Sequence, residues 1–194
     1  MKVKVIKVNK MKRVFVFLVF LQISATSVSA QSVKWHSFEE ALQLNAERAA
    51  NGLPTKKIFV DVYTDWCGWC KRMDATTFAH PVIAEKLNTD WVAVKLNAER
   101  KDTVVINGQA FINENQGTRS AHQLAQILLN GKMSYPSYSL IDEAGKPIQV
   151  IAGYQEVKQF EMLLDFFSSN AYLNMSFDDF QKTFKSLIQE QNGE

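Results

Sequence analysis

Two cysteines form the part of this sequence that is best suited to chemistry. Cys67 and Cys70 are the only cysteines in 194 residues, and they lie three positions apart. An apolar run that predicts a buried strand, Ile58–Tyr63, comes before them, and the residues from Lys71 onward predict a helix. Cys67 is therefore expected near a helix N-terminus, where unpaired N–H groups and the helix dipole stabilise a thiolate. Cys70, one turn further along, is close enough to form a disulfide with Cys67.

Two other interpretations of the cysteine pair are weaker. A zinc site normally needs four ligands, but a second Cys-x-x-Cys is absent and the three histidines, His36, His80 and His122, lack ligand spacing. A purely structural disulfide would close so short a loop that it would stabilise the fold only weakly. Thiol–disulfide exchange is the chemistry that remains, and it requires no bound metal and no organic cofactor.

The first thirty residues predict a secretory signal peptide. Six basic side chains precede an apolar core, Val14–Leu21, that is too short to span a bilayer comfortably. Small residues at Ser27–Ala30 then provide a cleavage site near Ala30–Gln31, so the mature chain is expected in a periplasm or in the medium without stable membrane insertion. An uncleaved membrane anchor is the alternative.

Removing this leader changes the charge of the protein. The formal net charge is +2, and residues 1–30 carry six basic and no acidic side chains, so the mature chain has a charge of −4. The basic character therefore belongs to the leader, and nothing in the mature chain indicates nucleic-acid binding.

Residues 31–194 predict one domain, with a core at about 55–167 and a C-terminal helical extension at about 170–190. A capping-box pattern at Ser37 opens an N-terminal amphipathic helix, and Ser176 opens a last helix that is expected to run through Leu187.

The order of the central elements predicts a strand, a long crossover and a second strand. The second strand, Trp91–Leu96, follows the cysteine helix, and this arrangement implies that the two strands are parallel. The irregular stretch from Lys101 onward predicts a hairpin around Asn107-Gly108, and a further hairpin is predicted at Tyr138–Ile151.

Four landmarks in this order resemble those of thioredoxin-fold proteins over about residues 55–167. They are an Asp six residues before the first cysteine, a lysine in the next strand, a Tyr-Pro-Ser tripeptide, and two later glycines: Asp61, Lys95, Tyr135–Ser137, and Gly145 with Gly153. The resemblance implies an α/β thioredoxin fold, a central mixed sheet flanked by helices, with extra N-terminal and C-terminal helices. Among thioredoxin-like proteins, the chain resembles exported bacterial oxidoreductases near the C-terminal domain of the transmembrane disulfide reductase.

The resemblance also implies roles for individual residues. Asp61 is expected beneath the disulfide, where it moves protons for Cys70 with Lys95 beside it, and burial in an apolar strand should raise the pKa of Asp61. The alternative for Asp61 is a structural ion pair with Lys95, and the two roles are compatible. A cis bond before Pro136 would place the Tyr135 backbone where it pairs with an extended substrate. An ordinary trans proline in a turn is the alternative there.

The two tryptophans complete the predicted substrate site. Trp69 is expected to be exposed, as part of an apolar rim for extended polypeptide. Trp66 has two interpretations, the same rim or packing on the sheet, and packing is favoured.

These patterns together predict an exported thiol–disulfide oxidoreductase with a Cys-Gly-Trp-Cys active site. Its expected substrates are exported proteins with disulfides, and the favoured direction is reduction, with a membrane-embedded electron donor. An oxidant or isomerase would use the same residues, and a non-catalytic peptide-binding module is the third hypothesis. Two features depart from ordinary thioredoxins: Gly-Trp replaces Gly-Pro between the cysteines, so a strongly reducing potential cannot be carried over, and the segment Lys101–Met133 is longer.

Overall fold

The computed structural model describes residues 32–115 and 117–188. The predicted signal peptide, residues 1–30, and its cleavage site at Ala30–Gln31 lie outside the described residues.

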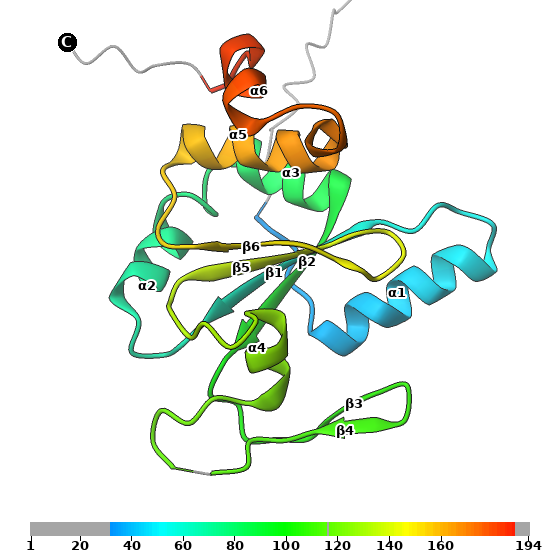
Figure 1. Cartoon of the computed structure of the whole chain (residues 1–194), viewed down its shortest axis with the longest axis vertical. Coiled ribbons are helices and arrows are strands. Elements are labelled where there is room, and N and C mark those ends of the chain that lie inside the picture. The colour runs from blue at the N-terminus through cyan, green and yellow to red at the C-terminus, as the bar shows by residue number, and fades with distance from the viewer. Residues whose placement is uncertain (1–31, 116, 189–194) are drawn as a thin grey trace, which may run out of the picture.

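A four-stranded mixed sheet lies at the centre of the molecule, in the order β2-β1-β5-β6 (Figure 1). Strands β1 (Lys57–Tyr63) and β2 (Trp91–Asn97) are parallel. Strand β5 (Ser137–Ile141) is antiparallel to β1, and β6 (Pro147–Ala152) is antiparallel to β5. The predicted parallel pair and the predicted second hairpin are therefore both present.

Helices cover the two faces of this sheet. On one face lie α3 (Pro81–Asp90) and α5 (Val157–Ser168), and on the other lie α1 (Phe38–Ala50) and α4 (Gln123–Leu128) (Figure 1). Helix α2 (Gly68–Ala75) contributes Met73 to the apolar cluster on the α3 and α5 face.

The alternation of side chains along β1 fills both apolar cores. Phe59 belongs to the cluster beneath α3 and α5, whereas Ile58, Val60 and Val62 belong to the cluster beneath α1 and α4. Successive residues of a strand point to opposite faces, so a strand covered on both sides becomes continuously apolar. Asp61 is the one carboxylate within this run, and it lies on the same side as Phe59.

The longer segment after β2 contains a small separate hairpin. Strands β3 (Val104–Ile106) and β4 (Gln109–Phe111) join through Asn107 and Gly108, which both have positive φ angles, 50° and 80°. Asn-Gly is favoured in two-residue turns of this kind because both positions need left-handed backbone. The predicted hairpin is confirmed.

The helix at the N-terminal end also agrees with the prediction. The side chain of Ser37 accepts a hydrogen bond from the N–H of Glu40, and the Glu40 carboxylate accepts one from the N–H of Ser37. This reciprocal capping box opens α1.

The C-terminal extension differs in part from the prediction. A 3-10 turn (Ala171–Leu173) leads into α6 (Phe177–Thr183), which Ser176 caps. The expected continuation of this helix through Leu187 is wrong, because the chain leaves the helix after Thr183. The N–H of Leu187 and the hydroxyl of Ser186 instead donate to the buried carboxylate of Glu161 in α5.

No helix within residues 32–115 and 117–188 combines the length and the apolar character needed to cross a bilayer. The architecture confirms the predicted mixed sheet with flanking helices and additional helices at both ends.

Candidate active site

The two cysteines form a disulfide at the start of α2. Their sulfur atoms are 2.04 Å apart, and both residues are buried. Cys67 is the N-cap of α2, and its sulfur accepts a hydrogen bond from the backbone N–H of Cys70 at 3.0 Å. The N–H of Cys67 donates to the carbonyl of Thr64 at 3.1 Å, which closes the turn between β1 and the helix. The predicted position of Cys67 at a helix N-terminus is confirmed.

Asp61 is buried in β1, with 2% of its surface exposed. Its partner across the parallel strand pair is Lys95, whose Nζ lies 3.4 Å from Oδ2 of Asp61. Burial raises the pKa of Asp61 to about 7, the charge of Lys95 opposes this rise, and the charge of Asp74 adds to it. The other carboxylate oxygen of Asp61, Oδ1, has no hydrogen-bond partner among the described residues. A carboxyl group in this state can exchange a proton near neutral pH.

Lys95 connects Asp61 to the cysteine helix. Its ammonium group also contacts the carboxylate of Asp74, which lies in α2 four residues after Cys70. Residues four apart lie on the same face of a helix, so this contact is one helical turn from Cys70. Three aromatic rings surround the Lys95 ammonium at 5.0–5.5 Å from their centroids: Trp35, Tyr63 and Phe78.

The peptide bond between Tyr135 and Pro136 is cis, as the resemblance predicted. The carbonyl of Pro136 accepts a hydrogen bond from the N–H of Gly153 at 2.8 Å. The Tyr135 ring lies against Trp66, with centroids 5.9 Å apart in an edge-to-face arrangement. Because Trp66 directly precedes Cys67, this contact brings the cis-proline segment beside the start of the cysteine helix.

Trp66 does not pack on the sheet, so the favoured interpretation of this residue is wrong. It is 50% exposed, and its indole N–H donates to Glu99 at 2.9 Å. The physical reason is that Trp66 lies in the turn after β1 has ended at Tyr63, where its ring contacts Tyr135.

Trp69 is 55% exposed, as expected. Its ring lies 5.3 Å from that of Tyr154, and the guanidinium carbon of Arg72 lies 5.5 Å and 5.4 Å from these two centroids. Both tryptophans therefore present ring surface to solvent next to the disulfide.

Several residues around the site were not predicted. The positions of Arg72 and Asp74 follow from helical spacing, since Arg72 comes three residues after Trp69 and Asp74 four after Cys70. Tyr154 and Arg119, whose guanidinium carbon lies 4.8 Å from the Trp66 centroid, carry no such local signal.

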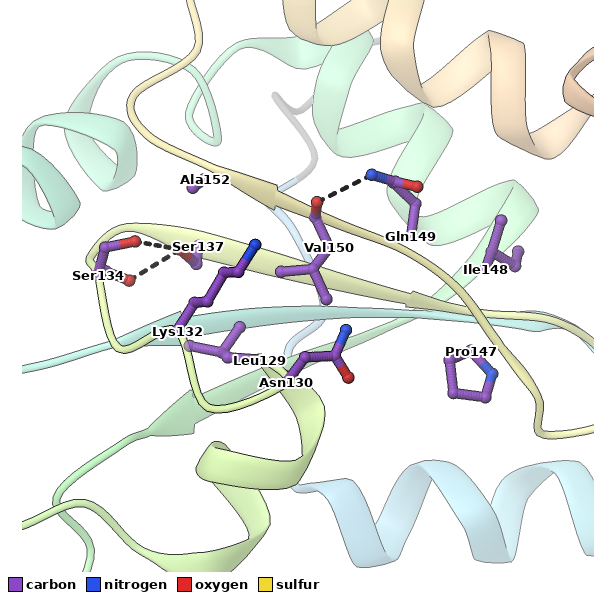
Figure 2. A pocket seen from close by; sticks show the side chains of 10 residues that line it. All are labelled: Leu129, Asn130, Lys132, Ser134, Ser137, Pro147, Ile148, Gln149, Val150 and Ala152. Carbon is purple, nitrogen blue, oxygen red and sulfur yellow. Dashed lines mark hydrogen bonds between the residues drawn. The ribbon is translucent and has the colours of Figure 1, made fainter.

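A pocket of about 390 Å³ lies beside the cis-proline segment and does not include the disulfide (Figure 2). It lies between β6 and the segment that follows α4, and Ser134 and Ser137, which flank Tyr135 and Pro136 in the sequence, lie at one end of it. Its lining residues are Leu129, Asn130, Lys132, Ser134, Ser137 and Pro147–Ala152 except Ile151. Within the described part of the chain, no group of three His, Cys, Asp or Glu side chains is arranged to hold a metal ion.

Comparison with known protein families shows to which family this chain belongs. Residues 44–168 match the family described as a thioredoxin-like domain. The chain belongs to this thioredoxin-like family. The predicted resemblance is thus confirmed, and the thioredoxin-like match covers the disulfide, the buried Asp61–Lys95 pair and the cis proline.

Solved structures similar to this thioredoxin-like chain include three of bacterial origin. A thioredoxin from Thermus thermophilus is 18% identical and covers 71% of this chain and 88% of its own, with a TM-score of 0.49. A putative disulphide-isomerase from Bacteroides thetaiotaomicron is 23% identical, with coverage of 71% and 94% and a TM-score of 0.47. The oxidised DsbD C-terminal domain of Neisseria meningitidis is 18% identical, with coverage of 71% and 99% and a TM-score of 0.43. No curated protein matches the sequence.

Proposed function

We propose that this protein is a thiol–disulfide oxidoreductase whose reactive group is the Cys67–Cys70 pair. The observation that carries the proposal is that the two cysteines of the chain are joined in a disulfide that caps the N-terminus of α2. After reduction, the Cys70 N–H and the helix dipole favour the thiolate of Cys67 over its thiol. A thiolate is the attacking species in disulfide exchange.

The proposed reaction has two steps. The Cys67 thiolate attacks one sulfur of a substrate disulfide, forms a mixed disulfide, and releases the other substrate sulfur as a thiolate that takes up a proton. Cys70 then attacks Cys67, which restores the Cys67–Cys70 disulfide and releases the second substrate thiol. Two electrons pass from the cysteine pair to the substrate in all. In this proposal Asp61 accepts the proton that Cys70 loses before its attack, because the raised pKa of Asp61 lets it accept and return a proton near pH 7.

The proposed direction is reduction of disulfides in exported proteins, with a membrane-embedded donor returning electrons to the pair. The predicted leader supports a location in the periplasm or the medium. The equilibrium reduction potential of the pair, measured in dithiothreitol or glutathione buffers on the protein without residues 1–30, tests the direction. A value near about −270 mV supports a reductase, and a value near about −120 mV assigns the pair to an oxidant.

A non-catalytic peptide-binding module is a second candidate, which the exposed rings of Trp66 and Trp69 favour. Cys67→Ser and Cys70→Ser separate the two candidates in an assay of disulfide reduction by the dithiothreitol-reduced protein. Loss of turnover in Cys67→Ser, with a trapped mixed disulfide in Cys70→Ser, supports the oxidoreductase. If the wild-type protein binds peptides but reduces no disulfide, the protein is a peptide-binding module.

A further inference from the structure

Two clusters of aromatic and basic side chains lie next to the disulfide. The Trp66 cluster consists of Trp66, Tyr135 and Arg119, and the Trp69 cluster consists of Trp69, Tyr154 and Arg72. In each cluster a half-exposed tryptophan contacts one tyrosine ring, and one guanidinium group lies over the indole. The Arg72 guanidinium also lies over its tyrosine.

Both clusters occupy positions that a substrate of the Cys67–Cys70 pair would meet. Each tryptophan directly precedes one of the two cysteines. Tyr135 directly precedes the cis proline, and Tyr154 follows Gly153, whose N–H donates to the Pro136 carbonyl. The tyrosines therefore come from two chain segments that are hydrogen-bonded to each other at the cis-proline segment.

Arg119 is brought to Trp66 by the irregular segment between β4 and α4. The buried side chain of Asn113 donates to the carbonyl of Ser120, and the Ser120 hydroxyl donates to the amide oxygen of Asn113. Lys101 donates to the Ser120 hydroxyl and to the carbonyl of Gly117, each at 2.9 Å. Arg119 itself has a φ of 62°, a left-handed conformation that is uncommon for a residue with a side chain.

The guanidinium groups of these clusters have unused hydrogen-bonding capacity. Arg72 and Arg119 are exposed, and within residues 32–115 and 117–188 neither forms an ion pair with a carboxylate. Two of the nearby carboxylates have other hydrogen-bond partners, because Glu99 accepts from Trp66 and Glu156 accepts from the Tyr154 hydroxyl at 3.5 Å. The N–H groups of a guanidinium that lies over a ring can still form bidentate hydrogen bonds with a carboxylate.

We propose that Arg72 and Arg119 select substrates that carry carboxylate side chains close to the reactive disulfide. The inference rests on the proposed oxidoreductase function and names its substrate class, an extended acidic polypeptide segment. The aromatic rings supply apolar contact surface, and the two arginines supply the charge preference. Three carboxylates at these clusters oppose this preference by repulsion: Asp65, Glu99 and Glu156.

Rates of reduction of three matched disulfide peptides test the proposal. The peptides have one sequence apart from the residues on both sides of the disulfide, which are glutamate, glutamine or lysine. The dithiothreitol-reduced wild-type protein is expected to reduce the glutamate peptide fastest and the lysine peptide slowest. Arg119→Gln and Arg72→Gln should each lower the glutamate-to-lysine rate ratio about two- to fivefold, the effect of a partly exposed ion pair. High salt should lower the same ratio.

Two control variants isolate the charge effect. Lys185→Gln removes one positive charge from an exposed position in the C-terminal segment and should leave the ratio unchanged. Asp65→Asn should raise the ratio. Equal wild-type rates on all three peptides, or a ratio that survives in the Arg72→Gln, Arg119→Gln double variant, would overturn the proposal.

Binding to a protein without thiols separates this proposal from the proposed function. In the Cys67→Ser, Cys70→Ser double variant, calorimetry should show tighter binding of the glutamate peptide than of the lysine peptide. If the wild-type protein reduces no peptide, the oxidoreductase function is wrong. The binding assay still tests whether the surface prefers acidic peptides, and equal binding of the two peptides would overturn that preference.

Discussion

The ammonium group of Lys95 lies 3.4 Å from a carboxylate oxygen of Asp61, on the strand next to it. The same ammonium group contacts Asp74 in the cysteine helix, so one positive charge is shared between two carboxylates. Burial is the main cause that raises the pKa of Asp61 to about 7, Lys95 opposes the rise, and the negative charge of Asp74 adds to it. Proton exchange near neutral pH at this site therefore depends on three charges.

Replacement of Asp61 should slow the second step of disulfide exchange. In Asp61→Asn, Cys70 loses the proton acceptor that we propose for it, so we expect the release of substrate from the mixed disulfide to be about 100-fold slower at pH 7. Stopped-flow fluorescence of Trp66 and Trp69, which adjoin the cysteines, would follow this step. Asp178→Asn, the same change at an exposed position in α6, is the control. An unchanged rate in Asp61→Asn at pH 7 would remove the proton-transfer role of Asp61.

The pH dependence of stability should also report on Asp61. Its pKa in the folded protein is about 7 against an ordinary 3.8, so the folded state retains a proton that the unfolded state has lost. The proton on Asp61 therefore stabilises the folded state. This stabilisation is fully present below about pH 3.8 and is lost as the pH rises to about 7, where the free energy of unfolding has fallen by roughly 4 kcal/mol. Asp61→Asn removes this term, so the stability of the oxidised variant relative to wild type should increase between these pH values. Urea unfolding at several pH values measures the difference, and a gap that is independent of pH would contradict the raised pKa.

Replacement of Asp74 should lower the pKa of Asp61. In Asp74→Asn one negative charge disappears, and Lys95 then pairs with Asp61 alone, so both changes favour the ionised carboxylate. Lys95→Met should have the opposite effect. Lys95 lowers the pKa of Asp61, so its removal should raise that pKa above about 7. Carboxyl carbon chemical shifts of Asp61 followed by NMR titration would measure both shifts. A pKa that moves in the same direction in the two variants would show that the three charges are not coupled as described.

The buried carboxylate of Glu161 should hold the C-terminal segment on α5. Glu161 is 0% exposed, accepts from the Leu187 N–H at 2.9 Å and from the Ser186 hydroxyl, and lies 3.9 Å from Nζ of Lys86. Glu161→Leu should reduce the free energy of unfolding by about 1–3 kcal/mol, since the Leu187 N–H and the Ser186 hydroxyl lose their buried acceptor while Lys86 keeps Asp165 at 2.6 Å. Urea unfolding measures the loss.

A smaller change at the same contact provides the control for Glu161→Leu. Ser186→Ala removes one donor and leaves the carboxylate with its Leu187 partner, so the loss should be about 1 kcal/mol. Neither variant should change the reduction potential of the cysteine pair. A C-terminal segment whose hydrogen exchange is equally slow in Glu161→Leu and in wild type would show that other contacts hold it.

Local signals in the sequence predicted most of the fold. The capping box at Ser37 and the Asn107-Gly108 turn depend on residues no more than four positions apart, and both are present. The end of the last helix was predicted wrongly, because its cause is a carboxylate 26 residues away from Leu187. The exposure of Trp66 was missed for a related reason, since its partners Glu99 and Tyr135 come from other parts of the chain.

The sequence by itself determined the reactive pair and its place at a strand-to-helix turn, because the apolar strand, the turn and the helix that position Cys67 and Cys70 are encoded by adjacent residues. Resemblance to a family added Asp61, Lys95 and Pro136. Only the tertiary structure decided that Lys95 is shared between Asp61 and Asp74, and that Arg119 lies over Trp66. These relationships join segments that are distant in the chain, and their geometry follows from how the elements pack together.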